Sequence, residues 1–197
     1  MKRLFLMGSI GCGKSTMIRS ALGRDISQAG GFLTVRITDG PKLLGFELVS
    51  PRAFHQGHRF LDFENGTLQK DRVFTDFGIS YLQTPASFAV IDEFGGLELL
   101  EDDFYNALLT FLQSDIPCIG VLKTEEAAAA MAEKVPLGPI YFQRYRTLLQ
   151  TLKNDPETQL IPTTGWQDQS TVEILAQWAE KYIRRRCNGA ALISGKN

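Results

Sequence analysis

The segment GSIGCGKST (Gly8–Thr16) is the most informative part of this chain of 197 residues. It fits the pattern G-x-x-x-x-G-K-[ST] completely. The short apolar run RLFLM (Arg3–Met7) precedes it and is typical of a strand buried on both faces. Residues 14–22 follow with apolar side chains at helical spacing, and Gly23 can end that helix. A glycine-rich loop between a strand and a helix is the context in which this pattern binds phosphate.

The residue types in this loop suit the phosphates of a nucleotide. Glycines let the backbone wrap around phosphate oxygens without Cβ clashes, so that several N–H groups converge on the anion. The N-terminus of the following helix adds a partial positive charge. We expect the Lys14 ammonium to reach the β- and γ-phosphates and act in catalysis, and the Ser15 hydroxyl to ligate Mg²⁺. The predicted nucleotide-binding residues are Gly8, Ser9, Ile10, Gly11, Cys12, Gly13, Lys14, Ser15 and Thr16.

Two carboxylates end a second apolar run, FAVIDE (Phe88–Glu93). An apolar strand that ends in acidic residues has the form of a Walker B element, whose aspartate holds the Mg²⁺ of a bound nucleotide. We therefore predict that Asp92 binds the metal, directly or through water. Glu93 is then placed to polarise a water molecule against the γ-phosphate. The alternative is a strand end that merely meets solvent.

Strands and helices alternate along most of the chain. Besides the first strand and helix, we expect strands at 87–91, 117–122 and 158–161, and helices at 75–83, 97–112, 124–134, 141–153 and 171–186. Because parallel neighbours need crossover connections, this alternation predicts an α/β fold with a mostly parallel sheet and helices on both faces.

Residues 30–75 do not follow this alternation of strands and helices. Two strands around a TDGP turn, within residues 30–50, predict a β-hairpin that is inserted into the sheet or extends its edge. The polar stretch 50–75 is expected to be irregular or to hold short strands. We expect a single domain over residues 1–187 and a flexible tail at 188–197.

The composition excludes several classes of protein. Hydrophobic residues make up 44% of the chain and charged residues 22%, so a mainly disordered chain is excluded. With a net charge of −1, the chain lacks the overall positive charge of proteins that bind nucleic acid without sequence preference. Three widely spaced cysteines form neither a disulfide framework nor a zinc site, and no stretch approaches the roughly 20 apolar residues of a membrane span. We therefore expect a cytoplasmic protein with no nucleic-acid or membrane partner.

Three segments give the chain a resemblance to a known family, the small nucleoside-triphosphatases of THEP1 type, also labelled predicted nucleotide kinases. In chain order they are GSIGCGKST (Gly8–Thr16), GFLTVRITDGPKLLGFELV (Gly31–Val49) and VIDEFGGLELLEDDFYNALLTFL (Val90–Leu112). The resemblance implies a P-loop NTPase fold of the ASCE (RecA-like) type. It also implies Mg²⁺-dependent hydrolysis of a nucleoside triphosphate to the diphosphate and phosphate, slow and tolerant of the base. The chain departs from the family pattern at Val35, where an acidic residue is usual, and at Lys123, where a His-Arg pair usually begins.

Five further residues are lesser candidates for the site. Lys123 ends a predicted strand, so its ammonium either faces the γ-phosphate or lies at the surface. Arg36, in the hairpin, either contacts substrate or pairs with an acid. Trp166 follows the last strand and either stacks on the base or belongs to the core. Arg144 and Arg146 either clamp a transferred phosphate, as a kinase lid does, or lie on an exposed helix face.

The residues alone are compatible with three different functions. The first is a nucleoside-triphosphatase in which Glu93 aligns water while Mg²⁺ and Lys14 offset the charge on the γ-phosphate. The second is a nucleotide or small-molecule kinase with the same loop and an acceptor in place of water. The third is a binding or assembly module with negligible turnover, in which the bound nucleotide organises the hairpin as a partner surface. Release of phosphate without an acceptor distinguishes the first from the other two.

Overall fold

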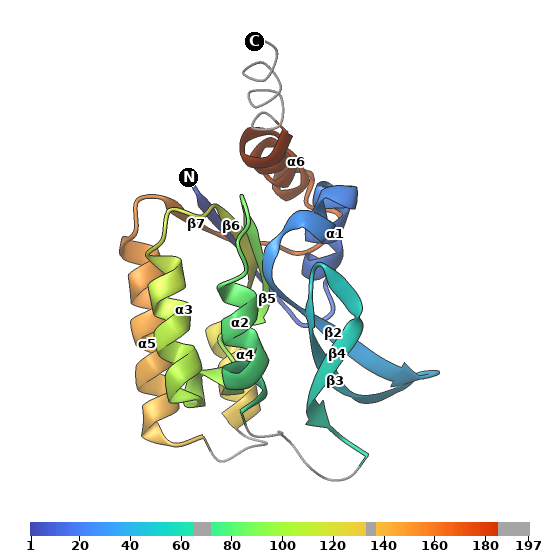
Figure 1. Cartoon of the computed structure of the whole chain (residues 1–197), viewed down its shortest axis with the longest axis vertical. Coiled ribbons are helices and arrows are strands. Elements are labelled where there is room, and N and C mark those ends of the chain that lie inside the picture. The colour runs from blue at the N-terminus through green and yellow to red at the C-terminus, as the bar shows by residue number, and fades with distance from the viewer. Residues whose placement is uncertain (65–71, 133–136, 185–197) are drawn as a thin grey trace.

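A seven-stranded sheet lies at the centre of the computed structural model (Figure 1), which describes residues 1–64, 72–132 and 137–184. The strand order is β4-β3-β2-β5-β6-β1-β7. The strands are β1 (Arg3–Met7), β2 (Gly30–Asp39), β3 (Lys42–Ser50), β4 (Ala53–Asp62), β5 (Ala89–Phe94), β6 (Cys118–Leu122) and β7 (Thr158–Pro162). The pairs β2–β5, β5–β6, β6–β1 and β1–β7 are parallel, so the predicted mostly parallel sheet is confirmed.

One strand separates the phosphate loop from the acidic pair. β1 leads into the loop, β5 carries Asp92 and Glu93, and both strands pair with β6. Parallel strands end at the same edge of a sheet, and ligands of open α/β sheets bind at that edge. The loop, the acidic pair and Lys123 after β6 therefore share one edge, in the strand arrangement of an ASCE-type P-loop fold.

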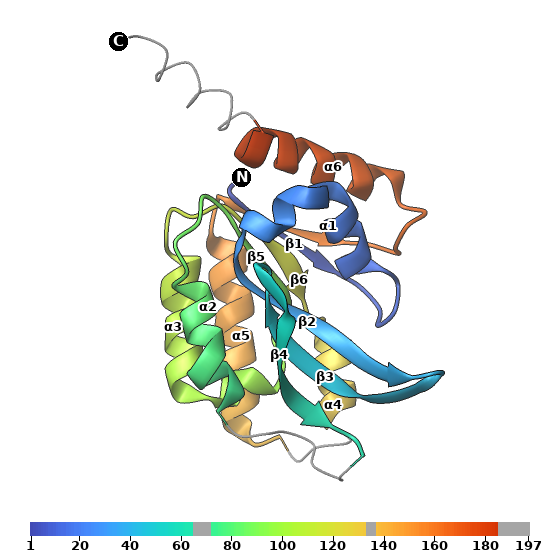
Figure 2. The ribbon, with the colours of Figure 1, turned by 45° about the vertical axis from the view of Figure 1, so that its right-hand side comes forward.

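Helices cover both faces of the sheet (Figures 1 and 2). One face carries α1 (Lys14–Leu22), η1 (Gly23–Gln28), α6 (Gln169–Ala179) and η4 (Glu180–Arg184). The other carries η2 (Phe74–Gly78), α2 (Ile79–Leu82), η3 (Leu97–Leu100), α3 (Asp102–Leu112), α4 (Glu125–Ala132) and α5 (Pro139–Asn154). In β1, Leu4 and Leu6 pack on the first face and Phe5 on the second, so this strand is apolar on both faces, as predicted.

The inserted segment is larger than the predicted hairpin. β2 pairs with β5 over Gly30–Phe32 and with β3 over Leu33–Asp39, so the insertion extends the edge of the sheet. The expectation of irregular structure or short strands is wrong for Ala53–Asp62, which is the ten-residue strand β4, antiparallel to β3. Sequence reasoning missed it because the edge strand AFHQGHRFLD is rich in polar residues and lacks the apolar alternation that marks a half-buried strand.

One predicted helix is interrupted, and another changes type along its length. The helix predicted at 97–112 is η3 followed by α3, with an extended residue, Glu101, between them. The helix predicted at 171–186 is α6 followed by η4, which reaches Arg184. Residues 185 and 186 and the predicted tail at 188–197 lie outside the described residues.

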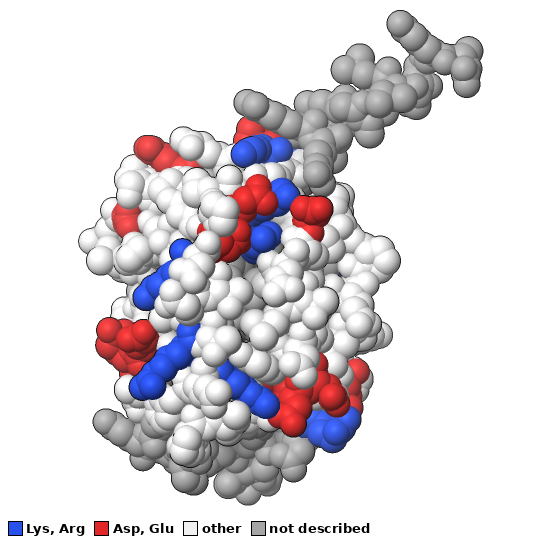
Figure 3. Space-filling model, turned by 90° about the vertical axis from the view of Figure 1, so that its left-hand side faces the viewer, with Lys and Arg blue, Asp and Glu red and all other residues white. Residues whose placement is uncertain are grey.

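The described surface carries charges of both signs. On the face in Figure 3, Lys and Arg side chains are interspersed with Asp and Glu rather than gathered in one basic stripe. Across the described ranges 1–64, 72–132 and 137–184, no helix has both the length and the hydropathy that crossing a bilayer requires.

Candidate active site

The phosphate loop lies between β1 and α1, where the sequence predicts it. Gly11 and Gly13 have φ values of 82° and 94°, in the left-handed region that glycine adopts without strain. They turn the chain into the N-terminus of α1, whose first residue is Lys14. Lys14 is almost fully buried, and its Nζ donates hydrogen bonds to the carbonyl oxygens of Gly8 (2.9 Å) and Ser9 (2.7 Å). The ammonium therefore reaches back across the loop to its first residues.

The loop and the acidic pair are in direct contact. Ser15 Oγ donates a hydrogen bond to Asp92 Oδ1 at 2.6 Å. Asp92 is 1% exposed, and its Oδ2 is buried without a hydrogen-bond partner among the described residues. Burial raises the pKa of Asp92 to about 7; the Ser15 hydrogen bond opposes this rise and the Glu93 charge adds to it. A buried carboxylate beside a hydroxyl is a set of hard oxygen ligands that suits a divalent cation, whose charge would favour the ionised carboxylate.

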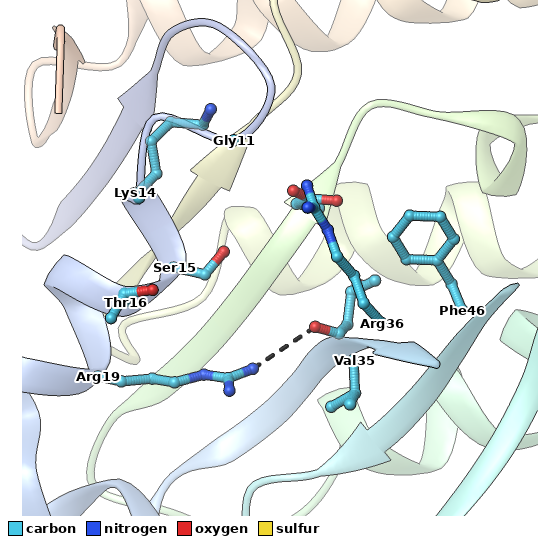
Figure 4. Close-up of a pocket in the computed structure, with 11 residues that line it drawn as sticks. Gly11, Lys14, Ser15, Thr16, Arg19, Val35, Arg36 and Phe46 are labelled. Atoms are coloured by element: carbon cyan, nitrogen blue, oxygen red, sulfur yellow. Dashed lines mark hydrogen bonds between the residues drawn. The ribbon is translucent and has the colours of Figure 1, made fainter. Parts of the chain in front are cut away.

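Arg19 belongs to this part of the site, and the sequence analysis missed it. Its Nη2 lies 3.8 Å from Asp92 Oδ2 and donates a hydrogen bond of 3.5 Å to the carbonyl oxygen of Thr34, the dashed line in Figure 4. The signal that could have found it is its spacing. Arg19 follows Ser15 by four residues in α1, which places both side chains on one face of the helix.

Glu93 has an uncommon backbone conformation. Its φ of 58° lies in the left-handed region, which is unfavourable for a residue with a Cβ and is often found at functional sites. The register of β5 against β6 shifts between Ile91 and Phe94, so Asp92 and Glu93 form an irregularity at the strand end. Such irregularities re-aim side chains. Here the Glu93 side chain lines a cavity beside the phosphate loop.

This phosphate cavity has a volume of about 350 Å³. Its walls come from the phosphate loop, α1, the inserted strands and Glu93 (Figure 4). The lining residues are Gly11, Gly13, Lys14, Ser15, Thr16, Arg19, Thr34, Val35, Arg36, Phe46 and Glu93. Five of the nine predicted nucleotide-binding residues, Gly11, Gly13, Lys14, Ser15 and Thr16, thus share one cavity with the predicted base, Glu93.

A buried carboxylate supports the turn that follows Glu93. Glu98 Oε1 accepts hydrogen bonds from the backbone N–H groups of Gly95 (2.6 Å) and Gly96 (2.7 Å). Burial raises the pKa of Glu98, and these N–H donors oppose the rise. Tyr141 Oη also donates to the Gly95 carbonyl oxygen at 3.0 Å. These bonds hold the backbone just beyond Glu93.

Two of the lesser candidates lie near the acidic pair. Arg36 is exposed on β2 and lines the phosphate cavity. Figure 4 shows Arg36 and its register partner Phe46 extending from the inserted strands toward the loop. Lys123 is half-buried and lines two further cavities together with Glu93. Both cations therefore border the region where phosphate charge would need compensation.

Trp166 borders the phosphate loop and does not belong to the core. It is 50% exposed, so the core alternative is wrong. Its indole packs on Gly13, since a Cβ added to Gly13 would lie 2.7 Å from Trp166 Nε1. A Cβ on Gly165 would likewise lie 2.2 Å from the carbonyl oxygen of Cys12. The turn between β7 and α6 therefore packs directly against the loop and leaves an indole half-exposed beside it.

The structure does not bring Arg144 and Arg146 to the site. Arg144 donates to the Leu99 carbonyl oxygen at 2.8 Å, pairs with Asp102, and lies 4.9 Å from the centroid of the Tyr105 ring. It thereby ties α5 to η3 and α3. Arg146 is exposed and borders a separate surface cavity along α5. A phosphate clamp built from these two arginines is therefore not supported.

Comparisons with known proteins agree with this geometry. A profile of the family described as NTPase matches residues 3–138, which is well over half of the chain. The nucleoside-triphosphatase THEP1 of Thermotoga maritima is 23% identical over 138 residues, covering 61% of this chain and 74% of that protein. The nucleoside-triphosphatase THEP1 of Pyrococcus abyssi is 28% identical over 132 residues, covering 61% of this chain and 73% of that protein.

Solved structures share the fold. The crystal structure of THEP1 from the hyperthermophile Aquifex aeolicus aligns with a TM-score of 0.60 at 17% identity, covering 89% of this chain and 96% of that one. The solution structure of a human cancer-related nucleoside triphosphatase aligns over the whole of both chains, with a TM-score of 0.56 at 18% identity. With the family profile matched over most of its length, the chain belongs to the NTPase family of P-loop proteins, the nucleoside-triphosphatases of THEP1 type.

Proposed function

We propose that this protein hydrolyses nucleoside triphosphates to the diphosphate and phosphate in the phosphate cavity, with Mg²⁺ as cofactor. The observation that carries the proposal is the 2.6 Å hydrogen bond between Ser15 and Asp92. It joins the phosphate loop to the acidic pair, and Glu93 lines the same cavity. A phosphate cradle, a pair of oxygen ligands and a carboxylate near water are the parts that phosphoryl transfer to water requires.

Ser15 and Asp92 are the residues that we propose hold Mg²⁺. Mg²⁺ prefers oxygen ligands and usually keeps several waters beside one or two protein ligands. When bound, it would offset negative charge on the β- and γ-phosphate oxygens. Arg19 supplies positive charge beside the second oxygen of the Asp92 carboxylate, 3.8 Å away. Together these groups favour the ionised carboxylate that metal binding needs.

The other charged residues have roles that follow from their positions. Lys14 would exchange its hydrogen bonds to loop carbonyls for bonds to phosphate oxygens. Glu93 would accept a proton from the water whose oxygen attacks the γ-phosphorus. The bond from the γ-phosphorus to the bridging oxygen breaks, and the diphosphate leaves. Arg36 and Lys123 would add positive charge at the γ-phosphate end of the site.

Trp166 is the residue that we propose stacks on the base. Its half-exposed indole lies against Gly13. It does not line the phosphate cavity with Glu93, so it is available to the nucleoside end of the substrate. Every base offers a π-face to an aromatic ring, so stacking binds a base without selecting it. This contact supports the proposed tolerance of ATP, GTP and other nucleotides.

The cytoplasm is the location that we propose for this activity. Within the described part of the chain, Cys12 and Cys118 are both free thiols. Free thiols fit a reducing compartment, and the proposed substrate and Mg²⁺ are both present there.

A phosphate-release assay tests the proposed function. ATP, GTP, CTP and UTP are each supplied with Mg²⁺ or with EDTA and without an acceptor. We expect release from all four nucleotides with Mg²⁺ and none with EDTA. Lys14→Ala should abolish release, whereas Arg146→Ala, at an exposed residue that lines a different cavity, should not change it. Tight binding of Mg·nucleotide without release would refute hydrolysis and favour the assembly module.

A further inference from the structure

A second pocket adjoins the phosphate cavity near Glu93 and Lys123. Its volume of about 370 Å³ lies in the range of small-molecule sites, roughly 300–1,000 Å³. The phosphate loop, the inserted strands, the end of β6 and α4 form its walls. Its main apolar residues are Ile10 of the loop, Leu43 and Phe46 of β3, Phe63 after β4, Val121 of β6 and Ala127 of α4.

Charge and apolar surface are separated within the second pocket. Three charged residues, Lys14, Arg36 and Glu93, line both this pocket and the phosphate cavity. Of the apolar residues just named, all except Phe46 line the second pocket without lining the phosphate cavity. The pocket is therefore charged where it meets the phosphate cavity and mostly apolar elsewhere, with Lys123 and Thr124 as its further polar residues. A molecule with an apolar body and one polar group fits that division.

Three of the pocket's apolar side chains are exposed, whereas Val121 belongs to the core. Ile10 is 72% exposed, Phe63 42% and Leu43 36%. The Phe46 and Phe63 rings meet edge to face, with centroids 6.2 Å apart and planes at 85°. Such an aromatic corner can pack against a further ring. Exposed apolar side chains gathered around a concave site are typical of a ligand site.

We propose that the second pocket binds a small aromatic molecule that carries a hydroxyl group, and that this hydroxyl accepts the γ-phosphoryl group in competition with water. The inference rests on the proposed function, because Glu93 would serve both nucleophiles. The hydroxyl oxygen forms a bond to the γ-phosphorus, and the bond to the bridging oxygen breaks. The nucleoside diphosphate leaves, and the hydroxyl proton passes to Glu93.

2-Phenylethanol is the probe for this test, because it joins an aromatic ring to a primary hydroxyl by a short arm. The protein is supplied with Mg²⁺, ATP labelled in the γ-phosphate and rising 2-phenylethanol. Phosphate and 2-phenylethyl phosphate are then separated and counted. Ethanol at the same concentrations offers the hydroxyl without the ring. We expect saturable formation of 2-phenylethyl phosphate, a matching fall in free phosphate, and no ethyl phosphate above background.

Substitutions in the pocket locate the effect. Ala127→Phe fills the pocket from α4, and Ala129→Phe, on the exposed side of the same helix, is the matched control. Leu43→Asp places a charge at the apolar end, and keeps the test usable where Ala127→Phe does not fold. We expect Ala127→Phe and Leu43→Asp to lower 2-phenylethyl phosphate formation by about tenfold or more. Phosphate release without the probe should not change.

Three results would overturn the proposal. They are absence of 2-phenylethyl phosphate, formation that does not saturate, and equal formation by the wild type, Ala127→Phe and Leu43→Asp. Phosphate release without the probe reports on the proposed function separately. Release without transfer refutes the acceptor site alone, whereas no release under any condition refutes the hydrolase.

Discussion

Glu93→Gln is the substitution that tests the proposed chemistry most directly. The two side chains have the same size, and both carry a Cβ, so the left-handed backbone at this position costs the same in each. The change removes the proton acceptor and one negative charge. Asp92 loses a neighbour that helps to raise its pKa, so the substitution should not weaken metal binding. The effect is therefore confined to the step that activates water.

The expected loss follows from the role of a positioned base. General base catalysis contributes about 10²- to 10⁴-fold to a rate, or about 2.7 to 5.4 kcal/mol of barrier. The Glu93 side chain lines the cavity but makes no hydrogen bond to the loop among the described residues. Nucleotide affinity should therefore stay close to that of the wild type. The variant should bind Mg·ATP and release phosphate at least about a hundredfold more slowly.

Single-turnover phosphate release measures the chemical step, and isothermal titration with Mg·ADP measures affinity. Glu173→Gln, an exposed change on α6, controls for the loss of one charge far from the cavity. Phosphate release by Glu93→Gln within a few-fold of the wild type would remove Glu93 from the mechanism. A large loss of affinity with unchanged single-turnover rate would make Glu93 a binding residue instead.

Three further predictions concern the base, the sheet and a helix cap. Trp166→Ala should weaken ATP binding by about 5- to 150-fold but leave binding of inorganic tripolyphosphate unchanged in calorimetry; equal losses would contradict stacking. Gly120→Ala should lower the free energy of unfolding by about 3 kcal/mol in denaturant titration, since its Cβ would lie 1.9 Å from a carbonyl oxygen of β5. Gly138→Ala, whose Cβ would meet no described atom within 4 Å, should cost much less, about 1 kcal/mol at most from the altered N-cap of α5. Hydrogen bonds from Ser170 and other donors in the first turn of α6 lower the pKa of Asp168 to about 2. These hydrogen bonds to the ionised carboxylate stabilise the folded protein fully above about pH 4, and the stabilisation is lost as the pH falls through about 2. The melting temperatures of the wild type and Asp168→Ala should therefore differ at pH 6 and converge near pH 2.

Many features of this structure can be predicted from residues that are neighbours in the chain. The phosphate loop is predictable because its chemistry resides in one short segment, Gly8–Thr16, whose glycines, lysine and hydroxyl act on the same anion. The strands around it are predictable because burial on both faces requires continuous apolar runs, as in Arg3–Met7. The helices follow from apolar periodicity, which is equally local. The strand β4 was not predicted because its sequence, rich in polar residues, carries neither a continuous apolar run nor an apolar alternation.

Other features depend on pairings between distant segments. The 2.6 Å contact between Ser15 and Asp92 exists because β6 holds β1 and β5 at a set spacing. Arg19 gains its role only when α1 packs over β2, and Trp166 reaches Gly13 only when β7 lies beside β1. The second pocket forms only where the phosphate loop, the inserted strands, the ends of β5 and β6, and α4 converge. Composition and periodicity indicate which side chains of each segment are buried and which are exposed to solvent. Which side chains face one another is determined by hydrogen bonding between strands that are far apart in the chain.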